Sequence, residues 1–105
     1  MDVLIQVLER KNLCFRNFYK LCEKFLDEVS KGDTTNIEQF QMRRQALINV
    51  LEQLETEVIR FLDGYKDKPS ALDAMMTGTA KSQINFLLRE KDTTVKAILD
   101  LDLQI

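Results

Sequence analysis

The apolar residues of the first third of the chain recur at alternating spacings of four and three residues. The row runs through Leu4, Leu8, Phe15, Phe18, Cys22, Phe25 and Val29, with Lys11 at its one polar position. Further apolar residues widen this row into a stripe: Val7, Cys14, Leu21 and Leu26. Such a period is typical of a helix that buries one face. Gly32 can take the left-handed conformation that ends many helices, so the pattern predicts a helix over residues 2–31.

A second stripe with the same spacing follows after a short polar stretch. It runs through Ile37, Phe40, Arg44, Leu47, Leu51, Leu54, Val58, Phe61 and Tyr65. Thr35 and Glu38 have the spacing of a capping box, in which two side chains bond free amides at a helix start. Gly64 and the polar run behind it end the pattern. We therefore expect a helix over residues 35–65, packed antiparallel on the first because the connection is short.

The last third of the chain has a weaker pattern. A helical segment is expected over residues 70–77, followed at 77–79 by Thr-Gly-Thr, which either breaks the helix or lets it continue. A further helix is expected over residues 80–100. Residues 100–105 alternate between apolar and polar, which fits a disordered tail, with a helix end or an added strand as the alternatives.

These elements predict one all-α domain over residues 1–105. Its architecture is an antiparallel helical hairpin with a third, continuous or broken, helix, in an elongated three- to four-helix bundle. The composition agrees with this, since 45% of the residues are hydrophobic, 30% are charged, and there are 3 glycines and 1 proline. That is little material for the tight turns of a β fold.

Charge and hydropathy narrow the function. The formal net charge of -2 and the pI near 5.2 give no basic excess that would draw the chain to nucleic acid. The longest apolar runs, at 3–5 and 86–88, are far shorter than the ~20 residues of a membrane span. We expect a cytoplasmic protein that binds no nucleic acid and does not insert into a membrane.

Catalytic, metal and cofactor sites are not expected. The chain has no histidine, which removes the usual partner of zinc sites and nucleophile–base pairs. Cys14 and Cys22 are about 12 Å apart on a helix, too far for a disulfide, and their place on the stripe favours buried thiols over a redox role. The acidic residues Glu52, Glu55 and Glu57 face outward without a converging partner. The chain is therefore expected not to be an enzyme.

Arg44 occupies a position of the second stripe where an apolar residue is expected. In an antiparallel hairpin that turns at 31–35, Arg44 should face about position 22, and Lys11 should face about position 55. Arg44 would then cover the edge of the core with its stem and pair with Glu23 or Asp27 of the first helix. A direct contact with a partner protein is the alternative.

The order of aromatic and apolar residues on the first helix, the Lys-Gly-Asp turn at 31–33 and the "RRQALI…LEQLE" run of the second helix suggest a family. They resemble flagellar type III export chaperones of the FlgN/FliT kind, small cytoplasmic helical proteins that hold late flagellar subunits before export. The resemblance covers most of residues 4–65 and, less completely, 81–105. It implies that the last helix grips a helical segment of a hook-associated or filament-cap type client through apolar residues: Ile84, Leu87, Leu88, Val95, Ile98 and Leu99.

The thinness of the predicted bundle also indicates a binding partner. Three long helices with wide apolar stripes make a thin bundle, which leaves apolar surface for another helix. That helix belongs either to a client, as for an export chaperone or adaptor of type III-secreted structural proteins, or to a second copy of the chain. In the second case the protein is a self-assembling coiled coil or helical bundle with no export role.

Overall fold

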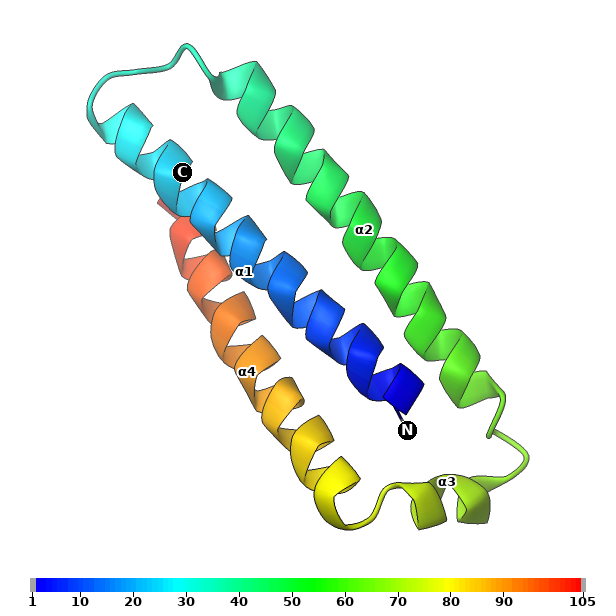
Figure 1. Cartoon of the computed structure of the whole chain (residues 1–105). Coiled ribbons are helices and arrows are strands. Elements are labelled where there is room, and N and C mark those ends of the chain that lie inside the picture. The colour runs from blue at the N-terminus through cyan, green and yellow to red at the C-terminus, as the bar shows by residue number, and fades with distance from the viewer. Residues whose placement is uncertain (1, 105) are drawn as a thin grey trace.

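The computed structural model describes residues 2–104, which form four helices without a strand (Figure 1). Their bounds are α1 Asp2–Ser30, α2 Ile37–Asp63, α3 Pro69–Met75 and α4 Gly78–Asp102. The second helix runs antiparallel to α1, and α4 returns parallel to α1 after the short α3 crosses the end of the bundle. The predicted all-α fold with an antiparallel hairpin is confirmed.

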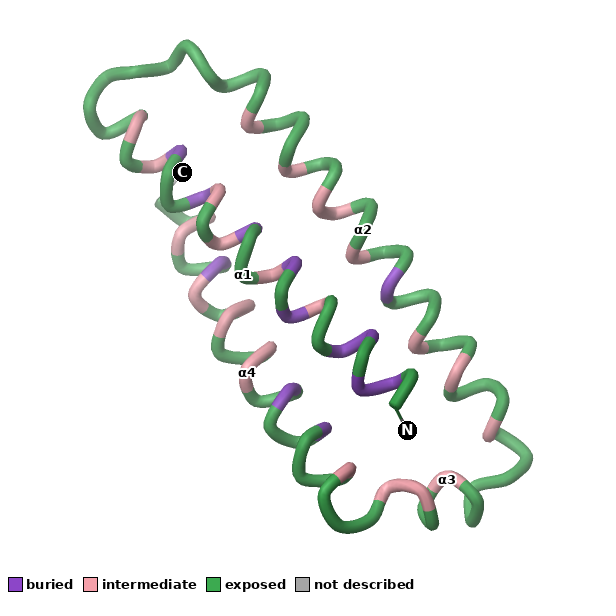
Figure 2. Tube along the Cα trace, in the orientation of Figure 1, coloured by how far each residue is buried: buried purple, intermediate pink, exposed green. Residues whose placement is uncertain are grey.

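The first helix is the centre of the molecule. It packs against both α2 and α4, whereas α2 and α4 make no comparable contact with each other. The buried side chains accordingly concentrate on α1, and Leu54 is the one residue of α2 classed as buried in the described part of the chain (Figure 2). The second helix thus packs on α1 with one edge and stays open along much of its length.

Two apolar clusters hold the helices together, one at each end of α1. Near its start, Leu4, Ile5 and Leu8 pack with Ile84 and Leu87 of α4. Toward its other end, Phe18 and Cys22 pack with Ile98, and half-buried side chains of α2 join both clusters. Burial of such side chains is worth roughly 2 kcal/mol each, so these two clusters dominate the cohesion of the bundle.

The connection between α1 and α2 differs from the expected capping box. The second helix begins at Ile37 behind Asn36, and no side chain caps it. Thr35 instead donates from its amide and its hydroxyl to Asp33 Oδ1, at 3.0 and 2.6 Å. These bonds stabilise the carboxylate and hold the pKa of Asp33 below its usual value. The capping-box prediction was therefore wrong, because the Thr35 hydroxyl bonds the Asp33 carboxylate and not an amide at the start of α2.

The third segment is broken. The short α3 ends at Met75, Thr77 is extended, and α4 starts at Gly78 with a φ of 58°. At the far end, α4 continues to Asp102 and closes in a turn through Gln104, so a helix end is the correct one of the three expectations for the tail. Ile105 lies outside the described residues.

The bundle is long and thin, with extents of 56 × 21 × 19 Å. None of the helices between residues 2 and 104 has the combination of length and apolar character that crossing a bilayer requires.

Candidate partner-binding surface

The six residues expected to bind a partner divide into two groups. Ile84, Leu87 and Ile98 are buried between α4 and α1, where they belong to the two core clusters. Leu88 and Leu99 are exposed, Leu99 by 57%, and Val95 is half-buried. The structure therefore brings the first group into the protein's own core and leaves the second group at the surface.

The exposed group lies on one side of α4. Leu88, Val95 and Leu99 are separated by seven and four residues, which keeps them on one face of a helix. Asp102, seven residues after Val95, reaches Arg44 of α2. This side of α4 is thus the side turned toward α2.

A matching line of side chains on α2 is turned toward α4. Its members are separated by seven, four and seven residues, which return to the same side of a helix: Arg44, Leu51, Glu55 and Leu62. Ile48 and Ile59 lie beside this line. Ile59 and Leu62 are exposed, and Ile48 and Leu51 are half-buried.

Together these residues form an apolar strip between two helices that both pack on α1 and that the Arg44–Asp102 ion pair joins to each other. We call it the α2–α4 seam, and it consists of Ile48, Leu51, Ile59, Leu62, Leu88, Val95 and Leu99. A fourth helix laid along the seam would cover the parts of these apolar side chains that α1 leaves exposed.

One ion pair spans the floor of the seam. The Lys11 ammonium of α1 bonds the Glu55 carboxylate of α2, as the predicted facing of positions 11 and 55 requires. The stem of Lys11 is largely covered, so this cation extends the apolar stripe and reaches a carboxylate at its tip. A second pair, Arg16 with Glu90, joins α1 to α4 on the other side.

Arg44 faces the expected part of α1 but has a different partner. Its guanidinium lies 5.7 Å from the centre of the Phe18 ring, and its Nη2 lies 3.5 Å from Asp102 Oδ2. The expected pairing with Glu23 or Asp27 is therefore wrong. The reason is that α4 runs parallel to α1 and delivers Asp102 to the open side of Arg44.

Asn12 is a buried polar residue between α1 and α4 that the apolar stripe did not reveal. It is buried, and its Nδ2 donates to the Leu87 carbonyl of α4 at 2.9 Å. Leu8 and Phe15 lie four residues before and three after it, so its place on the buried face could have been read from the spacing. This hydrogen bond joins α1 to α4 at one relative position of the two helices.

The two cysteine thiols have low reactivity. Cys14 and Cys22 are both free and buried, and Cys22 is 0% exposed. Burial raises the pKa of each thiol, and for Cys22 the Asp102 carboxylate raises it further while Arg44 lowers it. Protonated thiols in a core do not act as nucleophiles, which agrees with the expected structural role. No cluster of side chains that could hold a metal ion occurs within residues 2–104.

Comparison of the chain with protein families, with curated proteins and with solved structures finds no match in any of the three. The function is therefore inferred from the α2–α4 seam itself.

Proposed function

We propose that this chain is a helical chaperone or adaptor that binds an amphipathic helix of a partner protein along the α2–α4 seam. The observation that carries the proposal is the exposure of apolar side chains on the facing sides of α2 and α4. Exposed aliphatic residues on two adjoining helices offer a surface against which an amphipathic helix can lay its apolar face. On the resemblance described above, the client would be a type III-secreted structural protein of the hook-associated or filament-cap kind.

The proposal gives the residues of α4 two separate tasks. Ile84, Leu87 and Ile98 hold α4 against α1. Leu88 and Leu99 make the client contact, because they are exposed on the side that faces α2. A substitution of the second group can therefore weaken binding without opening the core.

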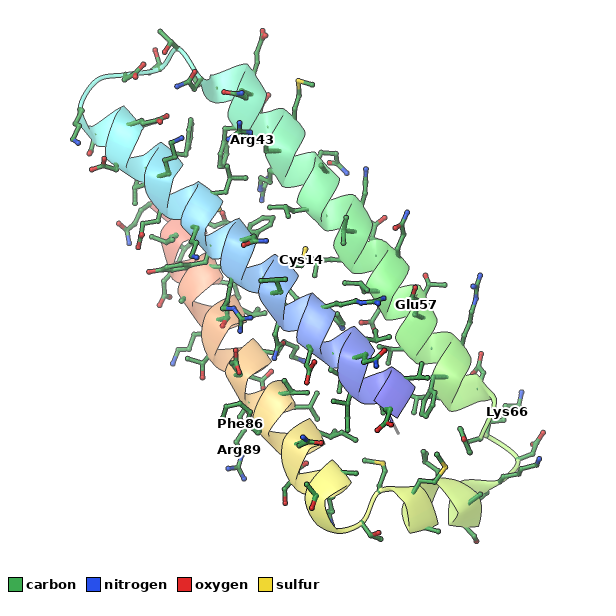
Figure 3. The ribbon with its side chains drawn as sticks, viewed as in Figure 1. Cys14, Arg43, Glu57, Lys66, Phe86 and Arg89 are labelled. Atoms are coloured by element: carbon green, nitrogen blue, oxygen red, sulfur yellow. The ribbon has the colours of Figure 1, made fainter. Side chains whose placement is uncertain are left out.

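The chain offers a matched control for this test. Phe86 is 64% exposed, more than Leu88 or Leu99, but it lies on the outer side of α4 together with Arg89, away from α1 (Figure 3). Phe86→Gln removes a large exposed apolar group outside the seam. Leu88→Gln/Leu99→Gln removes two smaller groups inside it.

The test is titration calorimetry with purified hook-associated and filament-cap proteins. We expect Leu88→Gln/Leu99→Gln to weaken binding at least about tenfold, since each lost aliphatic contact costs on the order of 1 kcal/mol. Phe86→Gln should bind within about twofold of the unmodified chain. Equal affinities of the two variants, or no binding by the unmodified chain, would contradict the proposal.

In the alternative, a second copy of the chain covers the seam. Sedimentation equilibrium distinguishes this self-assembly from client binding. If a second copy fills the seam, the unmodified chain is a tight oligomer and Leu88→Gln/Leu99→Gln is a monomer. A monomeric unmodified chain that binds a client supports the chaperone.

A further inference from the structure

A groove opens at the end of the hairpin because α4 stops short of it. Asn12 lies beside Leu87 and Arg16 beside Glu90, so on this parallel register the last turn of α4 lies near Asp27. The end of α1 and the start of α2 therefore extend past α4. Between them lies a groove with a volume of about 420 Å³.

The walls of this groove are largely apolar. Leu26 and Val29 of α1 face Ile37 and Phe40 of α2 across it. Phe40 is fixed by stacking on Phe25, with ring centres 3.9 Å apart and planes 9° apart. Val29 and Ile37 are both exposed, at 39% and 38%. One wall of the groove is thus the stacked pair Phe25 and Phe40. Val29 and Ile37 line it as well, and an aliphatic side chain of a ligand can lie between them.

Arg44 is the one charged residue among those lining the groove, and its hydrogen bonding is incomplete. Nη2 lies 3.5 Å from Asp102, longer than the roughly 2.8 Å of a good charge-assisted bond. Nε is buried and has no acceptor in the described structure. Nε and Nη2 form the edge of a guanidinium that binds a carboxylate through two parallel bonds. Of the two donors on that edge, Nη2 has one distant partner and Nε has none.

We propose that the groove receives an acidic, apolar segment of the partner helix. An aliphatic side chain of this segment lies between Val29 and Ile37. An Asp or Glu carboxylate of the segment displaces Asp102 from Nη2 of Arg44 and also accepts from Nε, which has no acceptor in the free protein. The inference rests on the proposed function and adds the chemistry of the partner, which is an amphipathic helix with a carboxylate flanking its apolar stripe.

The charges of the groove favour this occupant. Among the described residues, the lining contains one cation and no carboxylate, which suits a single acidic side chain better than a phosphate-rich ligand that needs several cations. The described end of α4 does not fill it, because the Leu103 side chain is 88% exposed.

The probes are two synthetic 18-residue amphipathic peptides with the same leucine stripe, one with Glu and one with Gln at a single flanking position. Their binding is measured by fluorescence anisotropy. The unmodified chain should prefer the Glu peptide about tenfold, the worth of a hydrogen bond to a charged group. Arg44→Gln should abolish the preference, and Asp102→Asn should increase it by freeing the guanidinium.

Arg43→Gln is the matched control, since it removes the same charge from the neighbouring, exposed residue and should keep the preference. Arg44→Lys keeps the charge without the two-bond edge, so it should retain only part of the preference. Circular dichroism and urea unfolding of each variant verify that the bundle is folded.

The outcomes separate this inference from the proposed function. If both peptides bind equally, and Leu88→Gln/Leu99→Gln weakens both, the seam binds helices and the role of Arg44 is refuted. A preference that survives Arg44→Gln also refutes it. If neither peptide binds but a hook-associated or filament-cap protein does, this inference is refuted and the proposed function stands; if none of them binds, both fail. If Arg44→Gln dissociates an oligomer of the chain, the occupant is a second copy and the partner inference is wrong.

Discussion

At the residue scale, the Asn12 side chain lies within the interface between α1 and α4, with Leu8 before it and Phe15 after it on the same face. Its hydrogen bond to the Leu87 carbonyl can form in only one register of α4 against α1. An apolar side chain at this position would pack against any neighbouring setting about equally well. Asn12 therefore contributes specificity to the α1–α4 contact, in the way that a buried polar residue fixes register in coiled coils.

Substitution of Asn12 tests this role. Asn12→Ala should lower the free energy of unfolding by about 1–2 kcal/mol through the lost hydrogen bond and contacts. Asn12→Asp at pH 7 should cost about 3 kcal/mol or more, because a buried carboxylate would face a carbonyl oxygen.

The pH dependence gives a second measure of Asn12→Asp. Burial raises the folded-state pKa of the new carboxyl above its unfolded value near 3.9, so stability is present at low pH and is lost as pH rises through the folded pKa. Urea unfolding of the variant against the unmodified chain at pH 4 and pH 7 measures the difference. Equal costs of Asn12→Ala and Asn12→Asp at both pH values would show that the carboxylate is solvated.

At the element scale, α4 is both a part of the core and a part of the binding surface. Ile98 is 7% exposed and packs on Phe18 and Cys22, whereas the adjacent Leu99 is exposed on the α2 side. A single turn of helix thus holds a residue that the fold requires and a residue that it leaves free. The same division runs along α4 from Leu87 and Leu88 onward.

The neighbouring pair Ile98 and Leu99 provides a prediction with an internal control. Ile98→Ala should lower the free energy of unfolding by about 2–4 kcal/mol, since it leaves a cavity at a buried site. Leu99→Ala should cost less than about 1 kcal/mol, because the side chain is already in water. Chemical denaturation followed by circular dichroism measures both. A large cost for Leu99→Ala would mean that the seam is covered in the free protein.

At the scale of the whole molecule, the shape follows from the central position of α1. Two helices nearly as long as α1 lie along it without closing on each other, and the length of the three helices makes the protein long and thin. The Cα radius of gyration is 17.0 Å, against about 13 Å for a compact domain of this length. An elongated bundle of this kind has a high ratio of surface to core, and this ratio leaves the seam uncovered.

Small-angle X-ray scattering checks this shape. At low protein concentration we expect a monomer with a radius of gyration near 17 Å, slightly larger with its hydration layer. Binding of a helix along the seam adds mass close to the long axis, so the radius should change little while the scattered mass increases. A radius near 13 Å for the free chain would mean that the long helices do not persist and that the chain forms a compact domain instead.

The sequence by itself determined the elements and much of the hairpin. The four-three spacing places the helices within a few residues of their observed bounds, because the period of an apolar stripe is a local property of the chain. It also predicts that Lys11 and position 55 face each other, since a short turn sets the alignment of an antiparallel pair. The buried positions of Cys14 and Cys22 follow from the same spacing.

The tertiary structure alone decided what α4 does. Periodicity marks Ile84, Leu87, Leu88, Val95, Ile98 and Leu99 as one apolar set but does not say which of them meet α1. The long connection through α3 leaves the path of α4 free, so the direction of α4, the partner of Arg44 and the division of the set depend on packing. Those contacts join residues far apart in the chain, and the pattern within one helix carries no information about them.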